Sequence, residues 1–278
     1  MDLETKVKIT DVSARIVNQF VLERTVVIAA YDADRLVDHC TGMLLRVGDE
    51  IVVITAAHMI KRFRPDQIQI IATSELSNIK CRPKFHRVKG GDHRSLVDVG
   101  YLTLSQSTAS LLEANSFLTF DQLEVYPAEI ESDLVLLFGM PTDDRVGPRH
   151  VCYKSFSFFT STAIGQTSQQ TVLPDVLFPI DYPEQVFDSF SNRLQKVPDP
   201  HGMSGGGVWR AKFKDTLVWS SKDIRLVGIL TEFHSGPQLI KANRIEPLLR
   251  LLARDFSEAE HFLKVSSSSN AAKASERR

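Results

Sequence analysis

A serine lies at the centre of the most glycine-rich stretch of the chain, residues 201–207 with the sequence HGMSGGG. Four of the fourteen glycines of the chain fall within six positions there. Glycine adopts backbone conformations that a Cβ forbids, so the stretch predicts a sharp bend that exposes Ser204. A serine hydroxyl becomes a nucleophile only beside a base, a group that orients the base, and donors for the oxyanion.

A histidine that suits the role of the base follows a strongly apolar run. Residues 51–54 are Ile-Val-Val-Ile, and His58 comes four positions later, after Thr55 and two alanines. This pattern predicts a strand whose rigid end holds the imidazole, with small neighbours that let another segment approach. Taken alone, His58 is more often typical of a hydrogen-bonded structural histidine than of a catalytic one.

A carboxylate that suits the role of the orienting group stands at the start of a second apolar run. Asp98 directly precedes residues 99–104, VGYLTL. A carboxylate there is costly unless it is hydrogen-bonded or paired, and an imidazole N–H is a suitable partner. A strand-entry aspartate that bonds its own turn is the alternative, and Asp92 is a weaker candidate because it lies in a polar loop.

The glycine-rich stretch can also supply the oxyanion donors. With glycine at position 202, the backbone N–H groups of Gly202 and Ser204 can converge on one point. A phosphate-binding loop is the other use of such glycines, but its Gly-x-x-x-x-Gly-Lys-Ser/Thr pattern is absent and no helical pattern follows. A plain hairpin turn also explains three successive glycines.

Short β-branched or apolar runs, separated by polar turns, predict the elements that position these residues. Such runs occur at residues 25–31, 40–46, 51–55, 67–72, 80–88, 99–104, 133–139, 151–160, 207–211 and 225–233. Many short strands favour an antiparallel barrel or sandwich over a parallel sheet. Residues 181–197 have no clean period.

Helical patterns are few. Residues 11–22 place apolar side chains four apart and predict a short amphipathic helix, and residues 107–115 predict one or two helical turns. A stronger helical pattern runs from about residue 244 to residue 256, with Asn243 as its predicted cap. From residue 266 the sequence is polar and of low complexity, which predicts a disordered tail.

Composition limits the classes of partner. The chain has 278 residues, 43% of them hydrophobic, and a formal net charge of −1, so we expect neither nucleic acid nor a membrane as a partner. The three cysteines are scattered, which fits neither a disulfide framework nor a paired-cysteine zinc site. No signal peptide and no run of roughly 18 apolar residues is present, so we expect a cytoplasmic protein.

Three blocks of the sequence, taken in order, resemble the catalytic blocks of trypsin-like serine peptidases of the chymotrypsin fold. They are TAAH at 55–58, DVGYL at 98–102 and GMSGGG at 202–207. His58 and Asp98 are 40 positions apart (98 − 58), and Asp98 and Ser204 are 106 apart (204 − 98). Weaker matches at Gly42, residues 138–141 and residues 226–229 extend the resemblance across residues 25–252.

The resemblance implies an all-β fold of two six-stranded antiparallel barrels, with the active site between them. Ser204 would be the nucleophile, His58 the base, and Asp98 the group that orients the base. The amides of Gly202 and Ser204 would form the oxyanion hole.

The resemblance also implies which residues bind the substrate. Thr231, Glu232 and Phe233 would line the groove and pair with an extended peptide. Pro198, six positions before the serine, would floor the specificity pocket, so nothing acidic would select Lys or Arg. Met59 stands where a cysteine commonly follows the histidine, which suits a cytoplasmic, bacterial-type member.

The expected domain organisation follows from the same resemblance. Residues 1–24 would form a helical extension and residues 25–265 the peptidase domain, with barrels at about 25–115 and 130–240 and a C-terminal helix at 243–264. Residues 266–278 would form the disordered tail.

The sequence therefore predicts a serine endopeptidase that acts on protein or peptide substrates without a cofactor. Because no zymogen-type cleavage site is recognisable, a protein partner that orders residues 198–204 is a further hypothesis. The alternative is a catalytically silent or gated trypsin-like fold that binds peptides in the same groove. A metal site is disfavoured because the eight histidines lack ligand spacing, and a cysteine nucleophile because no cysteine lies in a glycine-rich turn.

Overall fold

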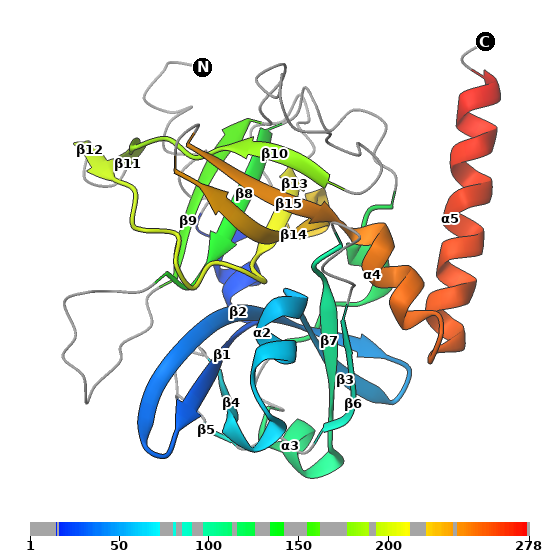
Figure 1. Ribbon diagram of the computed structural model, residues 1–278. Helices are drawn as coiled ribbons and strands as arrows, with labels where there is room; N and C mark the ends of the chain where they lie inside the picture. The colour runs from blue at the N-terminus through cyan, green and yellow to red at the C-terminus, as the bar shows by residue number, and fades with distance from the viewer. Residues whose placement is uncertain are drawn as a thin grey trace.

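Two antiparallel sheets make up most of the molecule. The computed structural model describes residues 15, 17–72, 80–81, 85–90, 97–112, 116–125, 134–141, 155–161, 177–188, 193–211, 221–235 and 238–276. Figure 1 shows the first sheet below the second, with a short helix, α2, near their junction.

The first sheet contains seven strands in the order β5-β4-β1-β2-β3-β7-β6. These strands are β1 Thr25–Asp32, β2 Arg35–Val47, β3 Glu50–Thr55, β4 Ile68–Ala72, β5 Lys80–Cys81, β6 Phe85–Gly90 and β7 Gly100–Leu104. One strand was expected over residues 80–88, but this segment contributes two, β5 and β6, which pair with β4 and β7 at opposite edges of the sheet. The expected six strands are therefore seven.

The second sheet contains six strands in the order β10-β15-β14-β13-β8-β9. These strands are β8 Leu134–Gly139, β9 Phe156–Ser161, β10 Leu177–Asp181, β13 Gly207–Ala211, β14 Ile224–His234 and β15 Leu239–Arg244. β10 and β15 were not expected from the sequence, because β10 contains a proline and β15 runs directly into a helix. A separate ribbon, β11 Gln185–Asp188 with β12 Arg193–Lys196, forms in the segment without a clean period.

Successive residues of single strands enter different hydrophobic clusters, which is why the strands are buried on both faces. In β1, Val26 and Ile28 lie in the core of the first barrel, whereas Val27 and Ala29 lie in a cluster shared with the second. In β13, Val208 lies in the core of the second barrel. This period of two is the alternation of side chains along a strand. The shared cluster packs the two barrels together and so fixes residues of one barrel against residues of the other.

The helices are short except at the C-terminus. Residues 17–22 are helical within the expected range 11–22; residues 1–14 lie outside the described part of the chain. α3 spans Gln106–Leu111, close to the helical turns expected at 107–115, whereas α2, Ala57–Arg62, was not expected from the sequence. Among the helices of the described residues, none is long and apolar enough to cross a membrane.

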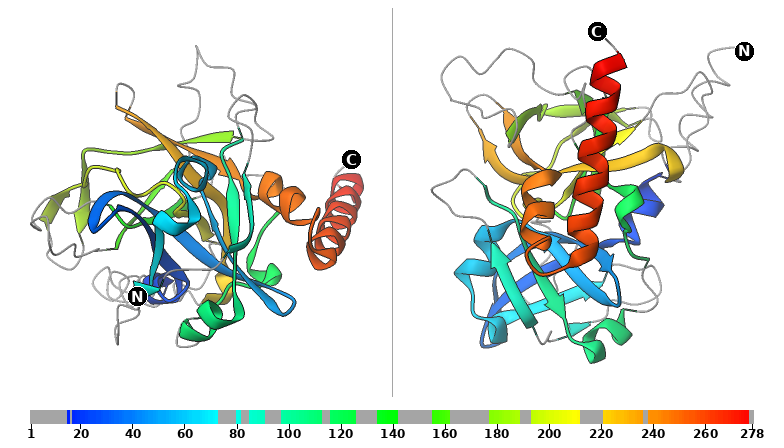
Figure 2. Two further views of the ribbon diagram at one scale, coloured as in Figure 1. Left: turned by 60° about the horizontal axis from the view of Figure 1, so that its bottom comes forward. Right: turned by 90° about the vertical axis from the view of Figure 1, so that its right-hand side faces the viewer.

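The C-terminal region differs from the expectation of one helix followed by a disordered tail. Two helices form, α4 Ile245–Leu252 and α5 Ser257–Glu276, and α5 continues through the expected tail (Figure 1). Figure 2 shows α5 along the outside of the molecule beside α4. Phe262 stacks on Phe120 with ring centroids 5.2 Å apart, which anchors the first turns of α5. Propagating a helix costs far less than starting one, so the alanine-containing residues after 266 extend it.

Candidate active site

The register of two strands brings Asp98 beside His58. β3 pairs antiparallel with β7, with Thr55 opposite Gly100, so the residues that follow Thr55 meet those that precede Gly100. The Ala57 amide donates to the Asp98 carbonyl at 3.3 Å and continues this pairing. His58 then lies in the first turn of α2, directly beyond the strand end that the sequence predicts.

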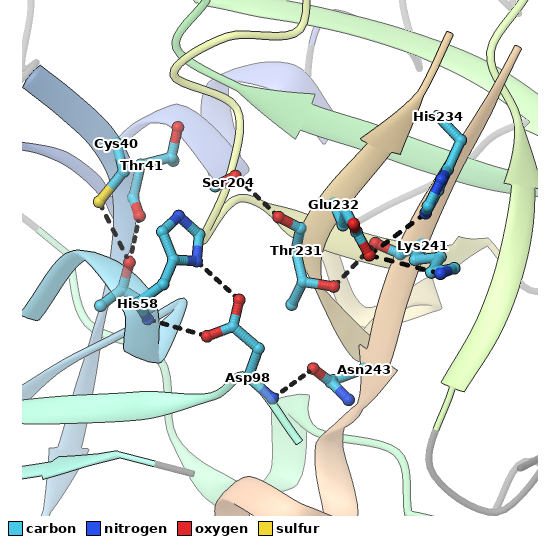
Figure 3. A network of polar contacts seen from close by, with 11 residues as sticks. Cys40, Thr41, His58, Asp98, Ser204, Thr231, Glu232, His234, Lys241 and Asn243 are labelled. Atoms are coloured by element: carbon cyan, nitrogen blue, oxygen red, sulfur yellow. Dashed lines mark hydrogen bonds and ion pairs between the residues drawn. The ribbon is translucent and has the colours of Figure 1, made fainter. Parts of the chain in front are cut away.

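Asp98 holds His58 through two hydrogen bonds. Its Oδ2 lies 2.6 Å from the ring Nδ1, and its Oδ1 accepts the backbone N–H of His58 at 2.8 Å (Figure 3). The His58 side chain is 37% exposed and that of Asp98 is 24% exposed. The carboxylate is therefore shielded, while the other edge of the imidazole remains accessible to a reacting group.

Asn243 joins this pair from the second barrel. Its Oδ1 accepts the backbone N–H of Asp98 at 3.0 Å, and the residue is fully buried. Asn243 was expected to cap the C-terminal helix, but it lies in β15, and the cap position of α4 is Arg244. A strand that runs into a helix without an intervening turn accounts for the wrong assignment.

The turn that carries Ser204 depends on glycine at two positions. Gly202 has φ +90° and Gly205 has φ +84°, conformations that residues with a Cβ rarely adopt. A Cβ on Gly202 would lie 2.2 Å from His39 Nε2, and one on Gly205 would lie 2.0 Å from the Thr41 carbonyl oxygen. The expected sharp bend is therefore present, and it packs tightly against the first barrel.

Some backbone amides of this turn are hydrogen-bonded to backbone carbonyls and others are not. Those of Met203, Gly205 and Gly206 donate to the carbonyls of residues 200, 230 and 203, at 2.7 to 2.9 Å. The amides of Gly202 and Ser204 have no acceptor among the residues that the structure describes. Two unbonded donors beside the serine hydroxyl suit an oxyanion.

Thr41 fastens the turn to the first barrel, and sequence reasoning missed it. Its hydroxyl donates to the Gly202 carbonyl at 2.8 Å and accepts the Met140 amide at 2.9 Å. Its own amide donates to the Ser204 carbonyl at 2.8 Å. Thr41 therefore holds the carbonyl groups of both Gly202 and Ser204, and so fixes the orientation of the peptide units of this turn.

The hydroxyl of Ser204 does not contact His58 in this structure. Its Oγ donates to the carbonyl oxygen of Thr231 at 2.9 Å (Figure 3), and no hydrogen bond joins Ser204 to His58. The three residues singled out by the sequence are thus gathered at one site. The hydrogen bond that would link the Ser204 hydroxyl to His58 is replaced by one to Thr231 of β14.

These residues line a cleft of about 660 Å³. Of the predicted groove residues, Thr231, Glu232 and Phe233 contribute to its wall, but Pro198 does not. The Pro198 carbonyl instead accepts the hydroxyl of Tyr182 at 2.9 Å, and its neighbours Asp199 and Pro200 line the cleft.

Glu232 is the most exposed of the predicted groove residues. Its side chain is 61% exposed and lies 3.2 Å from His234 Nε2 and 3.3 Å from Lys241 Nζ. The wall that β14 and β15 contribute is therefore charged.

The opposite rim of the cleft carries a polar cluster that the sequence analysis did not single out. Asp38 pairs with Arg62 at 2.9 Å and lies 3.5 Å from His201 Nε2. His39 is buried behind them, and its Nε2 lies 3.2 Å from the Met140 carbonyl oxygen. Burial, reinforced by repulsion from His201, lowers the pKa of His39.

Cys40 carries no reactive thiol at this site. It is free and fully buried, and its Sγ lies 3.5 Å from the hydroxyl of Thr55. Burial raises the pKa of Cys40 to about 12, so the thiol stays protonated at neutral pH. Cys152 lies outside the described residues.

Comparison with known proteins adds information about the fold. No protein-family model matches the chain, and no curated protein sequence matches it. Among solved structures, it is similar to a scabies mite inactivated protease paralogue, S-I1. The TM-score is 0.57 at 15% identity, over 85% of this chain and 96% of that chain. Together with the sheet order and the cleft between the barrels, this likeness shows that the chain has the trypsin-like, chymotrypsin fold.

Proposed function

We propose that the protein is a serine endopeptidase that cleaves peptide bonds through an acyl-enzyme. One observation carries the proposal: the Asp98–His58 pair and the hydroxyl of Ser204 meet at one cleft, beside two amides that lack acceptors among the described residues. A fold that needed only a binding groove would have no use for this arrangement.

The reaction begins with a rotation of the Ser204 side chain from the Thr231 carbonyl toward His58 Nε2. The imidazole takes the hydroxyl proton while Oγ attacks the substrate carbonyl, and Asp98 stabilises the imidazolium. The carbonyl oxygen, now negatively charged, accepts hydrogen bonds from the Gly202 and Ser204 amides. His58 then protonates the leaving amine, and water hydrolyses the acyl-enzyme by the same proton transfers in reverse.

The end of β14 supplies a surface for an extended peptide. Leu230 exchanges hydrogen bonds with Gly205 and Gly206, and β13 pairs with no residue of β14 beyond Ile229. Among the described residues, no strand pairs with residues 231–234 on the side of Ser204, where only the Ser204 hydroxyl bonds the Thr231 carbonyl, and β15 lies on the other side. A peptide that adds to this edge as a strand would place a carbonyl beside Ser204 Oγ.

A silent or gated peptide-binding module is the second candidate, and the hydrogen bond from Ser204 to Thr231 favours it. In this state the nucleophile is not activated. The structural neighbour is described as an inactivated protease paralogue, which shows that inactive members of this fold occur. An activating partner would need only to release the Ser204 side chain, since residues 198–204 already form their turn.

A fluorophosphonate probe separates the two candidates. Wild-type protein and a Ser204→Ala control are treated with the probe and weighed by intact mass. One adduct per chain, absent from the control, is the expected result for the peptidase. A folded wild-type protein without an adduct, as judged by circular dichroism, would favour the silent or gated module.

A further inference from the structure

The direction of the substrate side chain next to the cut follows from the groups around Ser204. The attacked carbonyl carbon carries an oxygen, a leaving amine and an α-carbon. The oxygen faces the amides of Gly202 and Ser204, and the leaving amine must face His58, which returns the proton. The α-carbon therefore faces the remaining part of the cleft wall, to which residues 199–202 and Phe233 contribute.

Tyr182 packs behind this part of the cleft wall, against both Pro198 and Phe233. Its hydroxyl donates to the Pro198 carbonyl at 2.9 Å and lies 3.4 Å from Met203 Sδ, so it is tied to the segment that leads into Ser204. Its ring packs edge-on against Phe233, with centroids 5.4 Å apart. Tyr182 thus joins the two walls between which a deep pocket would have to open, and it does not line the cleft.

The layer beneath Tyr182 is filled as well. Tyr182, Val197, Met203 and Ile240 are all buried in the core cluster of the second barrel, and Phe233 packs against that cluster. Their exposed fractions are 4% or less, apart from that of Phe233, which is half-buried. A packed core accommodates an inserted side chain only by moving its neighbours, which is costly.

From this arrangement we infer that the site accepts only a small side chain, such as that of Gly, Ala or Ser, on the residue before the cut. The inference rests on the proposed peptidase function and adds the class of substrate. Tyr182 and Phe233 are the residues that set the limit. A long basic side chain is excluded by the same closed space.

The test measures hydrolysis of N-acetyl amino-acid 4-nitrophenyl esters with Ala, Val, Phe and Arg side chains. Active sites are counted with a small alkyl fluorophosphonate, which carries no amino-acid side chain. Wild type should have a kcat/KM for the Ala ester about 100-fold above that for the Phe ester. Tyr182→Ala should reduce this ratio at least tenfold, whereas Tyr182→Phe, which keeps the ring, should leave it unchanged.

Phe233→Ala is the second opening variant, because Phe233 is only half-buried and its loss removes less of the core. It should also reduce the ratio. If the small probe labels Ser204 and the wild-type kcat/KM for the Phe or Arg ester is within threefold of that for the Ala ester, the inference is overturned while the proposed function stands. Two opening variants that remain folded and keep the wild-type ratio would also overturn the inference. A wild-type Ser204 that does not react with the small probe removes the proposed function, and the inference with it.

Discussion

The Asp98 carboxylate holds both the side chain and the backbone of His58. One carboxylate oxygen contacts ring Nδ1, and the other accepts the His58 backbone N–H. The second bond fixes where α2 begins relative to Asp98, and the first fixes how the ring is turned. Because Asn243 in turn holds the Asp98 amide, residues of both barrels determine the position of His58.

Replacing Asp98 with asparagine should abolish most of the reactivity of Ser204 while keeping the fold. The amide oxygen can still accept the His58 backbone N–H, but the amide NH₂ would donate to Nδ1. The ring proton would then sit on Nε2, where the base must accept the serine proton. We expect the labelling rate to fall by about 10²- to 10⁴-fold. Asp255→Asn, at a carboxylate that accepts Tyr101 away from the cleft, is the control and should label normally.

Replacing Thr41 with valine should loosen the turn that carries Ser204. The change preserves shape but leaves the Gly202 carbonyl and the Met140 amide without their partner, at about 1–3 kcal/mol for each buried group. We expect a lower free energy of unfolding in urea and labelling at least about tenfold slower. Thr41→Ser keeps the hydroxyl and should remain near wild type on both measures. Equal behaviour of the two variants would refute the fastening role.

The predicted reacting residues and the missed supporting residues differ in how local their signals are. His58 and Ser204 stand in short patterns, a strand end and a glycine turn, whose chemistry can be read from a few neighbours. Thr41 acts on Gly202 across 161 positions, and nothing beside it in the sequence marks it. Tyr182 is similar, because its role depends on the fold that brings Pro198 and Phe233 to its two sides.

The fold class followed from the number and texture of the apolar runs, but the ends of the second barrel did not. β15 is buried yet ends in Lys-Ala-Asn-Arg, a poor strand sequence that tertiary packing nevertheless holds between β10 and β14. The composition of the low-complexity residues after 266 predicted disorder. Composition alone does not show that a helix started by packed residues can continue through them, as α5 does.

Replacing Gly202 with alanine should damage the site beyond the cost of backbone strain. Its φ of +90° is unfavourable for alanine, and the added Cβ would approach the Met140 carbonyl oxygen to 2.6 Å and His39 still more closely. Relief of these clashes must move the Gly202 amide, so labelling of Ser204 should fall by at least about 100-fold. Gly48→Ala is the matched control. It also has positive φ, but its Cβ would meet only the end of the Glu258 side chain, far from the cleft. Normal labelling of Gly202→Ala would contradict this account.

Stability should fall as the pH drops below about 6.5, in part through His39. Its pKa is lowered in the folded protein, first by burial and then by repulsion from His201, with weaker opposing effects from the Met140 carbonyl and Asp38. The unfolded chain, with an ordinary histidine pKa of about 6.5, then binds the proton more readily than the folded protein does. The stabilisation is complete above that pH and is lost as the pH falls toward the folded pKa.

We expect the free energy of unfolding in urea to decrease less between pH 7.5 and pH 5.5 for His39→Gln than for wild type. His201→Gln should lie between them, since it removes the repulsion but not the burial. An identical decrease in all three proteins would show that protonation of His39 is not coupled to folding.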